Sequence, residues 1–284
     1  MCTLIVFDRV VPGFPLVVGS NRDEYYARPS QVPIRLDSRD GLNPSSGRSA
    51  SGENRPPIVA PQDLLAGGTW MGINAGGLFV GLTNRRTDSQ DPEARSRGQL
   101  VLDALGAPST QQARQAVDPM YGDNYNPYFL LLADGRETLL LSEAGDGQTA
   151  EELSPGIHVI GNLPPGHPEG ERIRWIEDRA AKLPIDAGLE PVFEGMREIL
   201  GTHLDVLNPR EGACVHTPLF GTRSSSLIAL GDKRWEWHHS EGPACEAKFD
   251  DLSRLSEELR LDASWRDAGA HETHRESIRY TGNA

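Results

Sequence analysis

The stretch MCTLIVFDRVVPGFPLVVG (residues 1–19) contains two short apolar runs rich in β-branched residues, separated by Pro12-Gly13. Two such runs around a Pro-Gly pair are typical of a β-hairpin. We therefore predict one strand over residues 3–7 and a second over residues 15–19. Cys2 then lies at the start of the first strand, and the polar residues that follow the second strand lie close to it in space.

The rest of the chain repeats this pattern in blocks. Strands alternate in hairpins, and helical spacing occurs in separate segments, which favours antiparallel sheets with helices outside them over a βαβ sheet. Residues 24–68 are polar and are predicted to form a long loop, with only residues 57–60 strand-like, that supplies pocket walls. Hairpins are predicted at 69–84 and 128–144, further strands at 156–162, 213–217, 224–230 and 234–239, and helices at 97–105, 109–117, 172–182 and 191–200.

The length of 284 residues suits one large domain. We assign residues 1–250 to that domain and residues 251–284 to a charged C-terminal tail. Within the tail, residues 251–261 have the spacing of an amphipathic helix. Beyond Ala263 the composition predicts disorder.

Composition excludes several classes of function. The chain has 28 Lys and Arg against 41 Asp and Glu, a formal net charge of −13, which disfavours binding to nucleic acids and to anionic membranes. The first fifteen residues do not resemble a signal peptide, and no apolar run approaches the roughly eighteen residues that a membrane span needs. These features predict a cytoplasmic protein with no stable membrane insertion. The oligomeric state is not predictable.

The cysteines and histidines predict neither a metal site nor a disulfide framework. The three cysteines, Cys2, Cys214 and Cys245, follow no Cys-x-x-Cys or Cys/His spacing. The eight histidines form no HExxH motif, and we interpret all of them as non-catalytic. The glycine-rich stretch GINAGGLFVG (residues 72–81) lies between strands, so it does not predict a dinucleotide cofactor. No cofactor is expected.

Cys2 is the first candidate for catalysis. Removal of Met1 would make it the N-terminal residue, with an α-amino group of pKa about 7.7 to 8.0 beside a thiol near 8.5. The amine could then act as the base for its own nucleophile. The alternative interpretation is a buried strand cysteine with no chemical role, and its position alone favours neither.

The sequence SNRDEYYARPS (residues 20–30) carries the second group of candidates. Asn21, Arg22, Asp23 and Glu24 lie at the strand end that the hairpin brings near Cys2. An aspartate there could accept a hydrogen bond from the amine or the thiol and hold the pair in place. A solvated charged turn would have the same composition.

These stretches together make the chain recognisable. MCTLIVF and SNRDEYYARPS, with GGTWMGIN, GLFVGLTN, RSRGQLV and LFGTRSSSLIAL further along, resemble the NRDE family, which includes the transport and Golgi organization protein 2 group. The resemblance covers about residues 1–230. It implies an N-terminal-nucleophile (Ntn) hydrolase-like fold, of class α+β, with two antiparallel sheets in a four-layer αββα sandwich.

Within that fold, the chemistry implied is similar to that of choloylglycine hydrolases and penicillin V acylases, whose mature cysteine attacks an amide carbonyl. The resemblance places Asp23 beside the amine, and it matches Asn84 to a residue that helps to hold the oxyanion. It also matches Asn162 to a residue that fixes the amine, and Arg223 to a late arginine near the thiol. Those enzymes carry an arginine where this chain has Ser20, which leaves the role of Arg22 open.

Each matched residue also has a structural interpretation. Asn84 and Asn162 suit strand-end turns, and Arg223 suits a surface ion pair. All lie at predicted strand ends, where a site at the rim of a sheet requires them. Asn21, Arg22 and Trp70 are candidate binding residues: Trp70 is more typical of a core, yet an apolar wall of this kind suits an acyl or ring-shaped ligand.

Two functions therefore remain open. The first is a cysteine amidohydrolase that acts on a small, non-peptide amide or acyl compound after Met1 is removed. The second is a non-catalytic binding or trafficking protein for haem or acyl lipids on the same scaffold, since a fold does not determine an activity. In either case the expected partner is a small molecule.

Overall fold

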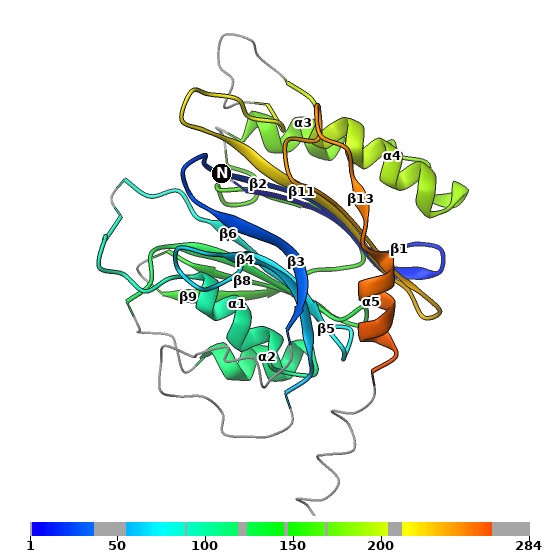
Figure 1. The fold of residues 1–284 in the computed structure, drawn as a ribbon, viewed down its shortest axis with the longest axis horizontal. Helices are drawn as coiled ribbons and strands as arrows, with labels where there is room; N and C mark the ends of the chain where they lie inside the picture. Colours follow the sequence, from blue (N-terminus) through cyan, green and yellow to red (C-terminus); the bar gives the residue numbers. More distant parts are fainter. Residues whose placement is uncertain are drawn as a thin grey trace, which may run out of the picture.

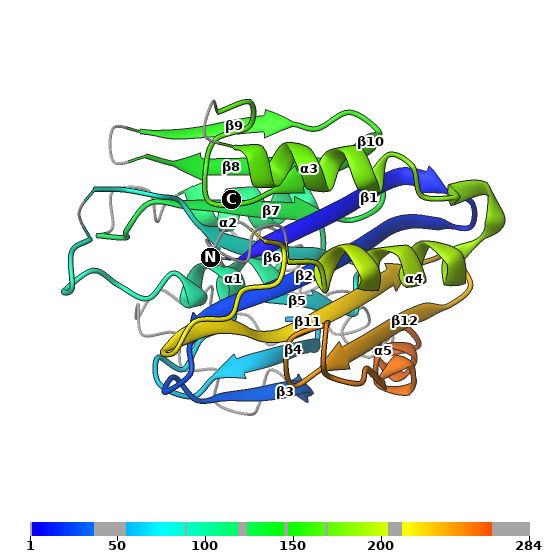
Figure 2. The ribbon, with the colours of Figure 1, turned by 90° about the horizontal axis from the view of Figure 1, so that it is seen from above.

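A computed structural model describes residues 2–36, 55–88, 90–118, 124–144, 147–167, 170–203 and 212–262. Two antiparallel sheets stack face to face, and a pair of helices covers the outer face of each (Figures 1 and 2). The predicted α+β class and the four-layer αββα arrangement are confirmed. None of the helices formed by the described residues combines the length and apolarity needed to cross a bilayer.

The sheet that carries Cys2, which we call sheet A, has six strands in the order β10-β1-β2-β11-β12-β13. Helices α3 and α4 cover it, joined by a short 3-10 turn at Ile185–Ala187. The bounds are β1 Thr3–Val11, β2 Phe14–Tyr25, β10 Gly156–Ile160, β11 Phe220–Leu230, β12 Trp235–Ser240, β13 Asp250–Asp251, α3 Glu171–Ala180 and α4 Leu189–Leu200.

Sheet B has seven strands in consecutive order from β3 to β9. Helices α1 and α2 pack on its outer face through β5, β6 and β7. The bounds are β3 Ser30–Leu36, β4 Ile58–Asp63, β5 Met71–Asn74, β6 Phe79–Asn84, β7 Tyr128–Ala133, β8 Thr138–Glu143, β9 Gln148–Glu152, α1 Gly98–Leu105 and α2 Thr110–Val117.

The alternation of side chains along the strands builds the three apolar layers. On β1, Leu4 and Val6 point between the sheets, whereas Ile5 and Phe7 point to α3 and α4. All four are at most 2% exposed, so both faces of this strand are buried, which explains its unbroken apolar sequence. The third layer lies between sheet B and the helices α1 and α2.

Most predicted elements are present. The hairpin β1–β2 turns at Pro12-Gly13 as predicted, and Gly13 has φ +81°, a left-handed conformation that glycine adopts without strain. Its strands are longer than the predicted 3–7 and 15–19, and residues 21–24 lie within β2 instead of after it. Helix α2 begins after Ser109, whose side chain accepts a hydrogen bond from the Gln112 N–H, as expected of an N-cap.

Two predictions of secondary structure were wrong, and one strand was missed. Residues 30–36 form strand β3 within the predicted long loop; Pro33 lies on an edge strand beside a register shift, where a missing N–H is tolerated. Residues 213–217 form an irregular segment with one isolated bridge from His216 to Gly221. Strand β9 was not predicted, because its sequence QTAEE is polar and largely exposed.

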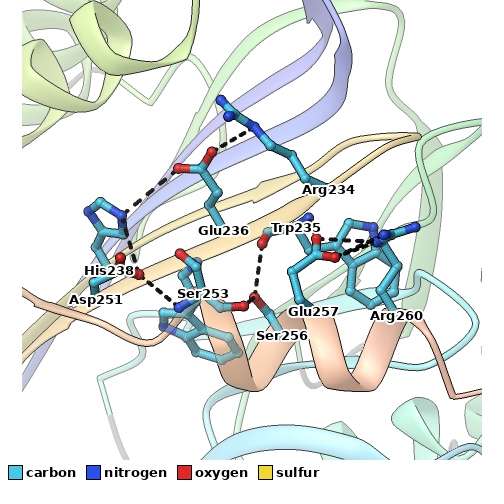
Figure 3. A network of polar contacts seen from close by, with 10 residues as sticks. Arg234, Trp235, Glu236, His238, Asp251, Ser253, Ser256, Glu257 and Arg260 are labelled. Carbon is cyan, nitrogen blue, oxygen red and sulfur yellow. Dashed lines mark hydrogen bonds and ion pairs between the residues drawn. The ribbon is translucent and has the colours of Figure 1, made fainter.

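Helix α5 (Ser253–Arg260) confirms the predicted helix of the tail, and it packs against the core that lies between the sheets. Figure 3 shows its polar contacts with β12: Ser256 Oγ donates to the Trp235 carbonyl oxygen at 3.2 Å, and the Glu257 carboxylate accepts from the Trp235 N–H. Arg260 pairs with Glu257 at 2.9 Å. The predicted disorder beyond Ala263 lies outside the described residues.

Candidate functional site

Cys2 lies immediately before β1, beside the end of β2 that carries the Asn-Arg-Asp-Glu tetrapeptide. Thr3 pairs with Asn21, so strand alternation places Thr3, Asn21 and Asp23 on the face toward α3 and α4. The same alternation places Cys2 and Arg22 on the face toward sheet B. The predicted proximity of the cysteine and the tetrapeptide is therefore present. Consecutive residues of the tetrapeptide point to opposite faces of sheet A, so only some of them share the face of Cys2.

The surroundings of the half-buried Cys2 thiol act on its charge in opposite directions. Burial raises the pKa of the Cys2 thiol, and the nearby Asp23 carboxylate raises this pKa further. The Arg22 guanidinium and a hydrogen bond from the Asp23 backbone N–H lower it, because both stabilise the thiolate. The net pKa lies above the ordinary thiol value, so the attacking thiolate requires a base.

Two guanidinium groups interact electrostatically with the Cys2 thiolate: that of the buried Arg22 and that of the half-buried Arg97. Arg22 stacks over the Trp70 ring at 4.3 Å, and burial lowers its pKa while the Cys2 thiolate raises it. Burial likewise lowers the pKa of Arg97, and the Cys2 thiolate raises it. The Arg97 guanidinium donates to the Pro127 carbonyl oxygen at 2.8 Å. Sequence analysis missed Arg97, although it lies within the quoted motif RSRGQLV.

A close backbone contact between Gly68 and Gly98 brings the segments that carry Trp70 and Arg97 together. A Cβ atom on Gly68 would lie 2.7 Å from the carbonyl carbon of Gly98, a separation that only glycine permits. The Thr69 N–H then donates to the Gly98 carbonyl oxygen at 3.3 Å. The loop that precedes Trp70 is thus held against the first turn of α1, which Arg97 precedes.

The Asp23 carboxylate is held by partners from two elements. Thr222 Oγ1 on β11 donates to Asp23 Oδ1 at 2.7 Å, and Arg172 on α3 lies 3.4 Å from Asp23 Oδ2. Arg172 also donates to the Thr3 hydroxyl. Sequence analysis missed Thr222 and Arg172, because nothing in the local pattern links α3 or β11 to the first hairpin.

Asn21, a candidate binding residue, forms hydrogen bonds within the protein through both its Nδ2 and its Oδ1. Its Nδ2 donates to the carbonyl oxygens of Leu200 and Ala213 at 2.9 and 2.7 Å, and its Oδ1 accepts from Ser225 at 2.7 Å. The side chain is fully buried. In this structure Asn21 ties β2 to the end of α4 and to the segment that follows it.

Asn84 and Asn162 meet where the two sheets join. The Asn162 carboxamide donates to the Asn84 carbonyl oxygen, and the Arg86 N–H donates to the Asn162 carbonyl oxygen at 2.7 Å. Thr83 Oγ1 donates to the Gly161 carbonyl oxygen at 2.6 Å. These bonds connect β6 of sheet B to the turn after β10 of sheet A. Among the described residues, neither side chain is hydrogen-bonded to Cys2.

Arg223 is a β-bulge residue that lines a cavity beside this site. Thr222 pairs with Asp23 and Ser224 pairs with Arg22, so Arg223 has no partner in the ladder between β2 and β11. The cavity has a volume of about 360 Å³, and its walls include Tyr26, Trp70, Arg223 and His239. Trp70, on whose ring Arg22 stacks, is thus part of the cavity wall, and Tyr26 belongs to the wall expected from residues 24–68.

His239 is a neutral member of the cavity wall. Ser226 Oγ accepts from Trp237 Nε1 at 3.3 Å and shares a hydrogen bond of 2.8 Å with His239 Nδ1. Burial lowers the pKa of His239 to about 4, from an ordinary value of 6.5.

His239 should make the protein less stable in acid. Its unfolded form binds a proton below pH 6.5 while its folded form stays neutral down to about pH 4, so the free energy of unfolding should fall as the pH decreases between these values. The contribution is roughly 3 kcal/mol. Urea unfolding at several pH values should show a flatter dependence for His239→Gln. Parallel curves for the two proteins would contradict this assignment.

Comparison with known proteins agrees with the fold. The family model described as Transport and Golgi organisation 2 matches residues 1–241. The Transport and Golgi organization 2 homolog of Mus musculus is 25% identical over 255 residues, which cover 76% of this chain and 82% of that protein. The Homo sapiens homolog is 26% identical over 261 residues, with the same coverage of each chain.

Two solved structures share the architecture. The Caenorhabditis elegans ortholog of N-acylethanolamine-hydrolyzing acid amidase superposes with a TM-score of 0.53 and 15% identity, over 92% of this chain and 98% of its own. The conjugated bile acid hydrolase of Clostridium perfringens superposes with a TM-score of 0.52 and 11% identity, over 92% of this chain and 95% of its own. At these identities the likeness concerns the fold.

Proposed function

This chain belongs to the Transport and Golgi organisation 2 family, and on that premise we propose that it is an N-terminal-cysteine amidohydrolase acting on a small amide or acyl compound. The observation that carries the proposal is the position of Cys2: its thiol accepts from the Asp23 N–H and interacts with the guanidinium groups of Arg22 and Arg97, beside a cavity. The names of the structural neighbours, an amidase and a bile acid hydrolase, agree with this chemistry.

The reaction begins with removal of Met1, which gives Cys2 a free α-amine. The amine accepts the thiol proton, and the thiolate attacks the acyl carbonyl carbon of the substrate. The carbon–nitrogen bond then breaks, the leaving amine takes up that proton, and a thioester remains on Cys2. Water attacks the thioester, releases the carboxylic acid and restores the thiol. Once Met1 has been removed, each turnover consumes only the amide and one water molecule.

The neighbouring residues have distinct roles in this proposal. Asp23, held by Thr222 and Arg172, accepts a hydrogen bond from the amine and orients it. Arg22 and Arg97 favour the thiolate. We assign oxyanion stabilisation to Asn84 and positioning of the amine to Asn162, following the family resemblance.

Unpartnered donors indicate the class of substrate. Among the described residues, Trp70 Nε1 and Arg223 Nε are buried, have no hydrogen-bond acceptor and belong to side chains that line the cavity. Buried donors are rarely left unpaired, so an acceptor from a ligand would satisfy them. We propose that the substrate carries oxygen acceptors, such as a carboxylate, at the end that enters the cavity.

The test is the intact mass of the purified full chain before and after exposure to a panel of acyl amides, followed by peptide mapping. We expect Met1 to be absent, and we expect one amide to add its acyl mass to Cys2 but not to the Cys2→Ala variant. Retention of Met1, or acylation that persists in Cys2→Ala, would contradict the proposal. Binding of haem or an acyl lipid with an affinity unchanged by Cys2→Ala, without acylation, would favour the trafficking function instead.

A further inference from the structure

Four potential metal ligands that are scattered along the sequence converge at the C-terminal end of α4. His203 follows that helix, Cys214 and His216 lie in the irregular segment before β11, and Cys245 lies in the turn after β12. One ligand atom from each residue lies within 4.8 Å of all the others. Linear spacing did not predict this cluster, because its members span three separate segments.

The separations suit a tetrahedral ion. Cys214 Sγ lies 3.4 Å from Cys245 Sγ, and His216 Nε2 lies 3.5 Å from Cys214 Sγ and 3.2 Å from Cys245 Sγ. Bonds of about 2.3 Å to sulfur and 2.0–2.1 Å to nitrogen at tetrahedral angles would separate two sulfurs by about 3.8 Å and sulfur from nitrogen by about 3.5 Å. The centroids of the His203 and His216 rings lie 4.9 Å apart, and the ring planes are tilted by 53°.

Backbone contacts around the cluster bring the four ligand residues together. The Cys214 N–H donates to the Thr202 carbonyl oxygen at 3.1 Å, which fixes the segment beside the end of α4. A Cβ atom on Gly201 would lie 3.2 Å from the Cys245 backbone, so the glycine permits the turn to approach closely. Cys214 and His216 are two residues apart in the irregular segment, and the Cys214 Sγ and His216 Nε2 atoms lie 3.5 Å from each other.

We propose that His203, Cys214, His216 and Cys245 bind one structural zinc ion. Two thiolates and two imidazoles in tetrahedral positions are the donor set that zinc prefers, and four protein ligands leave no open position for catalysis. The exposed His203 and Cys245 let the ion enter from solvent, whereas the buried Cys214 anchors the site. The proposal is independent of the function assigned to Cys2.

The zinc ion would stabilise the segment that supports Asp23 and Asn21. The Val215 N–H donates to Thr222 Oγ1 at 2.9 Å, and the Val215 carbonyl oxygen accepts from the Thr222 N–H at 2.8 Å. Thr222 in turn donates to Asp23, and the Ala213 carbonyl oxygen accepts from Asn21. Metal loss should therefore lower the melting temperature and increase hydrogen exchange in residues 212–217.

The test uses the full chain purified with a thiol reductant and without chelator. Elemental analysis should find about one zinc per chain. After stripping, the reduced protein should bind Co²⁺ with the intense visible bands of a tetrahedral site and a sulfur-to-cobalt charge-transfer band. Cys245→Ser and His203→Ala should weaken Co²⁺ binding by about tenfold or more, since loss of even an outer-shell partner has an effect of that size.

Matched variants elsewhere in the chain serve as controls. Cys2→Ser and His158→Gln should leave both zinc content and Co²⁺ binding unchanged. Cys245 and His203 are exposed, so their substitution should not prevent folding, and circular dichroism checks this. Absence of zinc together with absence of the Co²⁺ bands in the reduced parent protein would overturn the proposal, as would a native Cys214–Cys245 disulfide detected by mass in freshly isolated, unreduced protein.

Discussion

Replacement of Cys2 by alanine should lower the rate of amide hydrolysis by on the order of 10⁴-fold or more, because no other group of the proposed mechanism forms the bond to the acyl carbon. Any residual rate would come from positioning and oxyanion stabilisation alone. The fold should persist, since the side chain is small, half-buried and located before β1.

The measurement is steady-state hydrolysis of the amide identified by acylation, with melting temperature as the check on folding. Cys2→Ser offers a sharper comparison, because its hydroxyl retains a nucleophile with a much higher pKa. It should accumulate less acyl-enzyme than the parent protein but more than Cys2→Ala. Parent-like turnover by Cys2→Ala would refute the catalytic role of the sulfur.

Asn21→Leu should lower the free energy of unfolding by about 3–5 kcal/mol, since it replaces a buried carboxamide with an apolar group of similar size. The substitution removes three hydrogen bonds and leaves two carbonyl oxygens and the Ser225 hydroxyl without this partner. A role limited to ligand binding would instead leave the stability unchanged.

Asn74 provides the matched comparison on the other sheet. Its Nδ2 donates to the carbonyl oxygens of Leu105 and Ala107 at the end of α1, and its Oδ1 accepts two backbone N–H groups. Asn74→Leu should therefore destabilise the protein by a similar amount in urea unfolding at unchanged m-value. A loss below about 1 kcal/mol for Asn21→Leu alone would show that its bonds are not needed for folding.

The hairpins could be predicted because each carries its own local signal. Apolar strands and their turns lie together in the sequence, and the pair around Pro12-Gly13 already places Cys2 beside Asp23. Strand β3 and the irregular segment at 213–217 were assigned wrongly. Proline and polarity conceal an edge strand, and the apolar residues Ala213 and Val215 are buried without forming a ladder.

The parts of the site that could not be predicted depend on contacts between distant segments. Arg97 reaches the thiol region through a contact between Gly68 and Gly98, and Arg172 reaches Asp23 from a helix that follows ten strands. The cluster of His203, Cys214, His216 and Cys245 depends on three chain segments meeting. Contacts between distant segments depend on tertiary packing, so a local sequence pattern does not predict them.

Arg223 lines the cavity but takes no part in the pairing between β2 and β11. Because Thr222 faces Asp23 and Ser224 faces Arg22 on either side of it, a β11 lacking this residue would keep both pairings. Deletion of the Arg223 codon would therefore remove a positive charge from the cavity wall while the pairing between β2 and β11 stays the same. Insertion of an arginine codon at this point in a chain without the bulge would add that charge. Related chains could diversify their ligands here at little cost to folding.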